Sequence, residues 1–271
     1  MSDPGERIRI GTSGFSFPDW VGPFYPPGMK SPDFLAFYAQ HFDVVEVNST
    51  YYRVPHPRVL EQMERKTPAA FRFVVKLNQA MTHERSLDPA LFRDFLGAVE
   101  PLKRAGKYDG LLAQFPWAFR RNASSLEHLR ALRERLPDGP LFVEFRHDSW
   151  ARPEVMAFLR EHRLGHCVVD EPALPGLMPA VAEVTIEDAY VRFHGRNAAN
   201  WWAGSGADGG SKDRYDYNYS PAELGEWVKK VGELADRARR TYLFFNNCHA
   251  GQAARNAALM RELLRQQKLP A

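Results

Sequence analysis

Eight short apolar segments, separated by helical or loop crossovers, constrain the fold of this 271-residue chain. Strands that alternate with helices are typical of parallel sheets, and no linker interrupts the series. We therefore predict a single (β/α)8 barrel of the TIM type, forming one α/β domain over residues 1–271. An open doubly wound sheet is the alternative, but no glycine-rich dinucleotide fingerprint follows the first segment. The expected strands are 8–12, 43–48, 71–76, 110–115, 141–146, 165–170, 189–194 and 241–246.

Helix start signals mark several crossovers. Asp88 before a proline predicts a helix cap, and 124–127 and 220–223 each read as a capping box. The crossover over 171–188 is rich in proline and is expected to be poorly helical. The 195–219 segment is long and carries glycines and aromatic residues, so it is either a mobile lid or a fixed cover over the strand ends.

Polar side chains recur at the carboxyl ends of the expected strands, where barrel enzymes place their active sites. Alternation along each strand assigns them to the inside, in phase with apolar residues such as Val44, Val74, Phe142, Val168 and Phe244. Many polar residues in one phase favour a functional mouth over a set of satisfied strand ends. The inward set is Thr12, Glu46, Asn48, Lys76, Asn78, Gln114, Glu144, Arg146, Asp170, Arg192, His194 and Asn246.

Several motifs are similar to those of the YecE-like family of unknown function, over nearly the whole chain. The resemblance implies a TIM-like barrel and supplies no activity. Phe17 and Tyr51 are departures, where tyrosine and phenylalanine are more usual. The motifs are at 11–15 with Trp20 and 24–26, at 46–53, 144–150, 192–196 and 215–220, and at 245–247.

The residues themselves predict an enzyme that acts on a phosphorylated or carboxylated small molecule. Arginine forks bind oxyanions through two parallel hydrogen bonds, and converging charges shift one another's pKa values. The expected catalytic residues are Glu46, Lys76, Glu144, Asp170 and His194, with either Glu46 or Glu144 as general base. Substrate binding is expected from Asn48, Gln114, Arg146, Arg192, Arg196, Tyr215, Asn246 and Asn247. We further expect an ion pair between Lys76 and Glu46, and a partial ion pair between Asp170 and Arg192.

Other site chemistries stay open. A metal-dependent phosphodiesterase could use Glu46, Glu144, Asp170, His194 and His249, although Lys76, Arg146 and Arg192 would repel a dication. A glycosidase could use Glu46 and Glu144, and a Schiff base could form on Lys76. Cys248 beside His249 is a weak signal for a thiol nucleophile. A binding protein for an anionic ligand or a nucleic-acid strand is the non-catalytic alternative, and a closed ion-pair network is the purely structural one.

Composition narrows the remaining possibilities. The net charge of +3 does not indicate a nucleic-acid binder, although nucleic acid stays a possible partner. The two cysteines, Cys167 and Cys248, have neither metal-ligand spacing nor a disulfide framework, which suits a reducing cytoplasm. We expect no signal peptide, no membrane span, no cofactor and no bound metal. The oligomeric state is not predicted.

Overall fold

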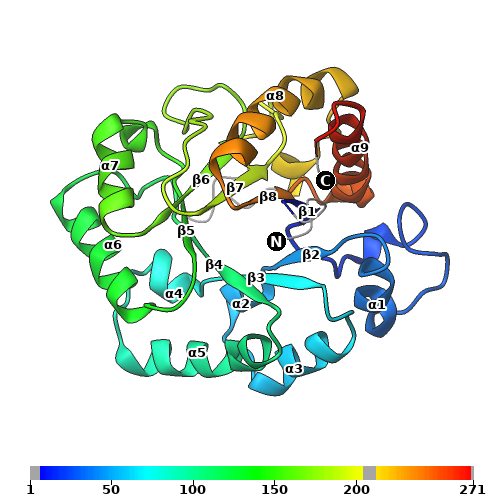
Figure 1. Ribbon diagram of the computed structural model, residues 1–271, viewed down its shortest axis with the longest axis horizontal. Helices are drawn as coiled ribbons and strands as arrows, with labels where there is room; N and C mark the ends of the chain where they lie inside the picture. The colour runs from blue at the N-terminus through cyan, green and yellow to red at the C-terminus, as the bar shows by residue number, and fades with distance from the viewer. Residues whose placement is uncertain (1–6, 204–211, 270–271) are drawn as a thin grey trace.

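The computed structural model describes residues 7–203 and 212–269 and has all eight expected strands in one parallel sheet (Figure 1). The sheet runs β1-β8-β7-β6-β5-β4-β3-β2, so neighbours in sequence are neighbours in space. This order confirms the barrel and excludes the doubly wound sheet. The strands are β1 (Ile8–Thr12), β2 (Val44–Val47), β3 (Arg72–Lys76), β4 (Tyr108–Gln114), β5 (Leu141–Glu144), β6 (Gly165–Asp170), β7 (Asp188–Phe193) and β8 (Arg240–Phe245).

The barrel closes between β1 and β2. A parallel bridge joins Ser13 to Glu46 just past the end of β1. The two strands approach so closely that a Cβ atom on Gly11 would lie 2.2 Å from the carbonyl oxygen of Val44. Glycine at this position therefore permits the contact that completes the ring.

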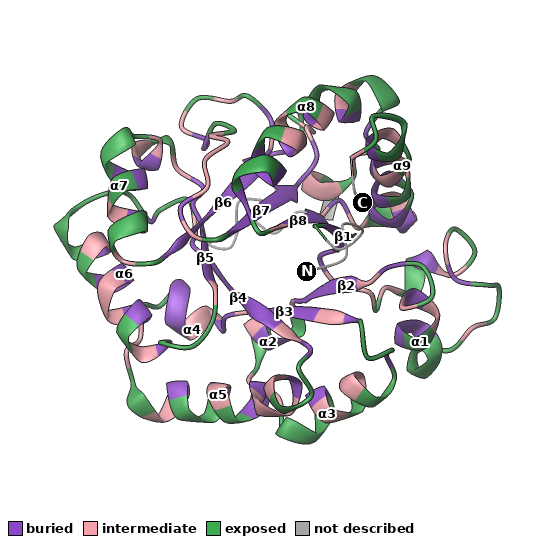
Figure 2. Cartoon of the chain, viewed as in Figure 1, coloured by how far each residue is buried: buried purple, intermediate pink, exposed green. Residues whose placement is uncertain are grey.

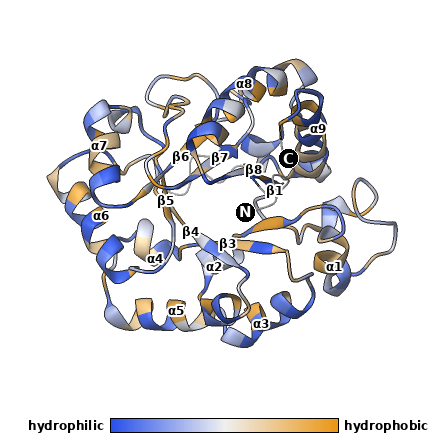
Figure 3. Ribbon diagram, viewed as in Figure 1, coloured by the Kyte–Doolittle hydropathy of each residue, from blue (hydrophilic) through white to orange (hydrophobic). Residues whose placement is uncertain are grey.

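Helices surround the strands, and their outer faces are exposed while the strands are buried (Figure 2). Figure 3 shows that the helices and the strands each carry both hydrophilic and hydrophobic residues. The helices are α1 (Phe34–Tyr38), α2 (Ser49–Tyr52), α3 (Pro57–Arg65), α4 (Gln79–Thr82), α5 (Pro89–Arg104), α6 (Ala123–Arg135), α7 (Pro153–Glu161), α8 (Pro221–Arg237) and α9 (Gln252–Gln266). Short 3-10 helices occupy Pro18–Trp20, Ser31–Asp33, Asp148–Trp150, Lys212–Tyr215 and His249–Gly251.

Two of the three predicted helix caps are confirmed. The Asp88 carboxylate accepts the backbone N–H of Ala90 at the start of α5, and Ser220 forms a complete capping box with Glu223 on α8. The box expected at 124–127 is wrong, because Asn122 caps α6 by accepting the N–H of Ser125. The crossover between β6 and β7 contains no helix, as its prolines indicated.

Aromatic rings fill the barrel beneath the mouth. Phe142, Tyr190, Tyr242 and Phe244 lie against one another, with the centroids of Phe142 and Tyr190 4.5 Å apart. Each of these residues is fully buried. The interior is thus a packed core, and a cavity can open only above it, at the carboxyl ends of the strands.

Candidate functional site

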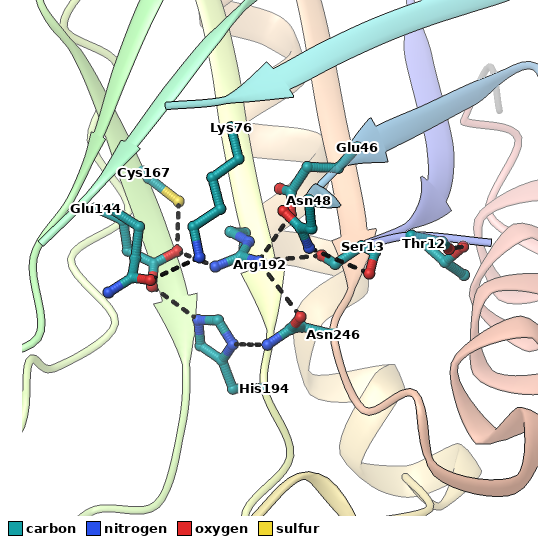
Figure 4. A network of polar contacts seen from close by, with 12 residues as sticks. Thr12, Ser13, Glu46, Asn48, Lys76, Glu144, Cys167, Arg192, His194 and Asn246 are labelled. Atoms are coloured by element: carbon teal, nitrogen blue, oxygen red, sulfur yellow. Dashed lines mark hydrogen bonds and ion pairs between the residues drawn. The ribbon is translucent and has the colours of Figure 1, made fainter. Parts of the chain in front are cut away.

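Arg192 on β7 lies between two buried carboxylates at the barrel mouth (Figure 4). Its Nη1 is 2.6 Å from Glu144 Oε2 on β5, and its Nη2 is 2.7 Å from Glu46 Oε1 on β2. Tyr190 donates its hydroxyl to the other oxygen of Glu46 at 2.6 Å. Glu46 and Glu144 are 0% exposed. One guanidinium therefore ties β2, β5 and β7 together across the barrel.

Arg146, just beyond β5, supplies a second cation. Its Nε lies 2.6 Å from Glu144 Oε1, and its Nη1 lies 3.1 Å from Glu171 Oε2. Burial would raise the pKa of Glu144, but Arg146 and Arg192 outweigh it and hold that pKa well below its usual range. Glu171 behaves oppositely, because burial outweighs Arg146 and raises its pKa to about 8. The raised pKa favours the protonated form of Glu171 beside Arg146.

His194 connects this network to β8. Its Nδ1 accepts from the Asn246 amide at 3.0 Å, which leaves Nε2 to carry the proton, 3.3 Å from Glu144 Oε1. Burial, followed by the repulsion of Arg146, lowers the pKa of His194 to about 3. His194 is fully buried. It is therefore neutral, lies beside the Glu144 carboxylate, and is not exposed to a substrate.

Lys76, at the end of β3, reaches the mouth without a carboxylate partner among the described residues. Its Nζ donates to Gln114 Oε1 at 2.8 Å and lies 4.3 Å from the ring centroid of Tyr51. The expected pair with Glu46 is wrong, because the strand register sets Glu46 beside Val74 and leaves Lys76 farther up the barrel. Burial and then Arg192 lower the pKa of Lys76 to about 7, although Glu144 and Glu46 oppose this shift.

These side chains surround a cavity of about 140 Å³. Within the part of the chain that the structure describes, its lining is cationic, amide-bearing or phenolic, and no carboxylate is included. Glu46 and Glu144 lie underneath and hold the arginines from below. The lining consists of Lys76, Arg146 and Arg192, of Asn48, Gln114 and Asn246, and of Tyr51, Tyr52 and Tyr215.

Asp170 and Arg196 do not belong to this cavity, so the inward orientation expected for Asp170 is wrong. The Asp170 carboxylate accepts from Tyr219 Oη at 2.7 Å and from Trp227 Nε1 on α8 at 2.5 Å, and lies 2.7 Å from Arg196 Nη2. Arg196 also meets Glu226 at 3.0 Å. The partial ion pair that we expected between Asp170 and Arg192 is therefore also absent, since Arg192 is bound by Glu46 and Glu144.

The error on β6 is a shift of one residue. Cys167 faces the interior, with its Sγ 3.7 Å from Glu144 Oε2, so Val168 and Asp170 face outward. On β1, Thr12 likewise contacts Tyr38 Oη on α1, while Ser13 faces inward with its hydroxyl 3.2 Å from Arg192 Nη2.

Two other expected residues lie away from the cavity. The Asn247 amide donates to the backbone oxygen of Tyr217 at 2.8 Å and to Asn256 Oδ1 at 2.7 Å. It therefore fixes the 212–219 segment to α9. Asn78 caps α4 by accepting the N–H of Ala80 and donates to the backbone oxygens of Thr50 and Tyr51.

The described parts of the 195–219 segment pack down over the mouth. Tyr219 accepts the N–H of Gly195 at 2.9 Å, and Asn197 donates to the backbone oxygens of Asp213 and Asp216. Trp201 is 1% exposed. These contacts agree with the fixed-cover hypothesis for residues 195–203 and 212–219. The glycine-rich stretch on which the mobile-lid hypothesis depended, 204–211, lies outside the described residues.

The donor geometry does not favour the metal or glycosidase alternatives. Arg192 fills the space between Glu46 and Glu144, where either a dication or a sugar would have to bind. Among residues 7–203 and 212–269, no cluster of three His, Cys, Asp or Glu side chains is arranged to hold a metal ion. Burial raises the pKa of the Cys248 thiol, and His249 lies 3.8 Å from Asp216. Cys248 therefore lacks the features of a reactive thiol.

A larger hollow of about 500 Å³ lies outside the barrel, between the 171–180 segment and α8. Its arginine, Arg196, is already bound to Asp170 and Glu226, and its lysine, Lys230, lies 4.7 Å from the Trp227 ring centroid. The charges that surround this hollow are thus largely satisfied within the fold. In the mouth cavity, by contrast, Lys76 has no carboxylate partner among the described residues.

Sequence reasoning missed five contributors to the mouth: Ser13, Tyr51, Tyr52, Glu171 and Tyr190. Tyr190 is in phase with Arg192 on β7, so alternation could have identified it. Ser13 lies next to Thr12, outside the phase that alternation selected. Glu171 follows β6 directly, but nothing in its neighbourhood indicated that it would turn back toward Arg146. Tyr51 lies in the short helix α2, which has no clear start signal in the sequence.

The fold and the site define the protein as a TIM-type barrel with a small cationic cavity at its mouth. The chain belongs to the DUF72 family of proteins of unknown function, whose model matches residues 9–271. It is 34% identical to the UPF0759 protein YunF of Bacillus subtilis, over 95% of this chain and 94% of that protein. It is 36% identical to YecE of Escherichia coli K12 over 104 residues, which are 37% of this chain and 36% of that protein.

Solved structures show the same architecture. A DUF72 family protein from Thermotoga maritima superposes with a TM-score of 0.87 at 43% identity, covering 96% of this chain and 99% of that one. A family member from Enterococcus faecalis gives a TM-score of 0.85 at 28% identity, with 95% of each chain covered. Within the described residues, no helix is both long and apolar enough to cross a membrane.

Proposed function

We propose that the mouth cavity binds the oxyanion of a small phosphorylated or carboxylated substrate, and that the protein is an enzyme acting on it by acid/base chemistry. The observation that carries the proposal is the lining: Lys76, Arg146 and Arg192 surround the cavity, and the carboxylates that balance them lie underneath. A charge-assisted hydrogen bond in such a site contributes roughly 1.5–3 kcal/mol.

Size favours a small molecule. The cavity of about 140 Å³ is well below the roughly 300–1,000 Å³ of pockets that enclose drug-sized ligands. A phosphate or carboxylate with a short carbon chain suits this space better than a nucleic-acid strand does. The amides of Asn48, Gln114 and Asn246 add neutral groups that can bind the hydroxyls of such a substrate.

The proton-transferring group that the geometry favours is Lys76. Glu144 is a poor general base, because its pKa is depressed and its oxygens face Arg146, Arg192 and His194. Glu46 is fully buried against Arg192 and Tyr190. Lys76 combines access to the cavity with a pKa of about 7, the range in which a general acid or base works best near neutral pH.

The test is a titration of sulfate, inorganic phosphate and glycerol phosphate, followed by thermal shift and calorimetry. Wild-type protein should show saturable stabilisation, and Arg146→Ala should weaken the apparent affinity by about 10–100-fold, the equivalent of one charge-assisted hydrogen bond. Arg146→Ala leaves Glu144 paired with Arg192, while Glu171 loses its arginine partner and keeps the backbone N–H of Met178.

Arg120→Ala is the matched control. Arg120 is exposed in the segment after β4, at the same end of the barrel, and contacts the ring of Trp117. Its loss should leave the anion response unchanged. Equal responses from wild type, Arg146→Ala and Arg120→Ala would remove the anion site. If anions bind but no phosphorylated or carboxylated compound is ever turned over, the non-catalytic binding protein becomes the better description.

A further inference from the structure

We propose that Lys76 is a nucleophile that forms a Schiff base with the carbonyl carbon of an anionic aldehyde or ketone, while Arg146 and Arg192 hold its phosphate or carboxylate. The proposal rests on the anion site described above and deepens it by naming the substrate class. It assigns the three cations of the cavity two different tasks: the arginines bind the charge, and the lysine reacts.

The surroundings of Lys76 differ from those of a lysine in a structural ion pair. Among the described residues, its Nζ has one hydrogen-bond acceptor, the neutral Gln114 Oε1, and it lies against the Tyr51 ring. Lys107, which is 4% exposed, is held by Glu64 Oε1 at 2.9 Å and by the backbone oxygens of Glu64 and Thr67. Lys107 is thus held by one carboxylate and two carbonyl oxygens, whereas Lys76 lines the cavity.

Burial is the largest influence on Lys76, and it favours the neutral amine. Arg192 on β7 acts in the same direction, as does Arg146 more weakly, while Glu144 and Glu46 oppose the shift. The pKa of Lys76 is lowered to about 7. At neutral pH about half of such an amine carries a free lone pair, whereas an ordinary lysine with a pKa of ~10.4 has less than about 0.1% in this form.

The reaction balances without an oxidant or a further reactant. The Nζ lone pair attacks the carbonyl carbon, and an N–H proton moves to the carbonyl oxygen to give a carbinolamine. The hydroxyl and the second N–H proton then leave as water, and the imine remains. Borohydride traps it by delivering hydride to the imine carbon, while solvent supplies a proton to nitrogen, so that a stable secondary amine forms.

The experiment treats the full-length protein with borohydride and either pyruvate or dihydroxyacetone phosphate, and maps the modified lysines by peptide mass spectrometry. We expect an adduct on Lys76 with at least one probe, formed at least about tenfold faster than on exposed Lys229, and no adduct on Lys107. Lactate and glycerol phosphate lack the carbonyl and should give none. The two carbonyl probes distinguish a carboxylate from a phosphate substrate.

Sulfate should slow the labelling of Lys76 and leave that of Lys229 unchanged, because only Lys76 shares its cavity with the arginines. Lys76→Arg should abolish the adduct at that position. If this variant folds poorly, the peptide map of the wild-type protein still shows whether Lys76 carries the adduct. Sulfate binding without any adduct on Lys76 would overturn the Schiff base and leave the anion site standing. An adduct that sulfate does not slow would overturn the role of the arginines.

Discussion

Replacing Arg192 with methionine should lower the free energy of unfolding by about 3–5 kcal/mol near neutral pH. Arg192 is 1% exposed and is the shared partner of Glu46 and Glu144, which are 0% exposed. Its loss leaves two buried carboxylates with much less compensation, although Arg146 and Tyr190 still contact them. Equilibrium unfolding in urea measures the change.

Arg160→Met is the matched control. Arg160 pairs with Glu183 at 2.7 Å, but the two side chains are 49% and 38% exposed, so its loss should cost no more than about 1 kcal/mol. The deficit of Arg192→Met should also depend on pH. The pKa of Glu144 is depressed in the folded protein, so its stabilising contribution is present above the unfolded pKa and is lost as the pH falls through the folded pKa. The deficit should therefore shrink in acid. Equal losses in the two variants would contradict the network.

Sulfate affinity should fall by about 10–100-fold as the pH rises through the pKa of Lys76, about 7. Sulfate keeps its charge over this range, so the change reports on the protein. Protonated Lys76 contributes a charge-assisted hydrogen bond, and the neutral amine does not. Calorimetric titrations with sulfate, from about one and a half pH units below this pKa to about one and a half above it, would give the affinity as a function of pH.

Lys76→Met should weaken sulfate binding below the transition and make the curve shallower across it, since the titration of Lys76 is lost. Glu171, whose pKa is raised to about 8, still titrates beside Arg146 in the variant. Arg146 and Arg192 should give the Lys76→Met variant a residual affinity for sulfate at all pH values. A wild-type curve that is flat, or a Lys76→Met curve as steep as wild type, would assign the titration to another group and leave Lys76 without a part in binding.

The fold could be predicted from the sequence because each strand is a short apolar run bounded by a turn or a capped helix. Alternation also placed Glu46, Lys76, Glu144, Arg146 and Arg192 correctly, since each follows apolar residues that fill the barrel. On β6 the same rule was wrong. Cys167 and Val169 face inward, while His166, Val168 and Asp170 face outward, so the polar residue at the end of this strand did not mark the inner face.

The partners of these residues were harder to predict than their positions. Lys76 and Glu46 lie on adjacent strands, which suggested a pair, but the register separates them by height in the barrel. Glu46 instead meets Arg192, 146 residues away in sequence and across the barrel. Such contacts depend on side-chain length and strand register together. Asp170 likewise faces Trp227, a partner on α8 that the local sequence does not indicate.

The most direct test of the anion site is diffraction from crystals soaked in selenate, collected at a wavelength where selenium scatters anomalously. The account predicts an anomalous peak in the mouth cavity, within hydrogen-bonding distance of Lys76, Arg146 and Arg192, and its loss or marked weakening in Arg146→Ala. A cavity without a peak at selenate concentrations that occupy other sites on the same molecule would contradict the account.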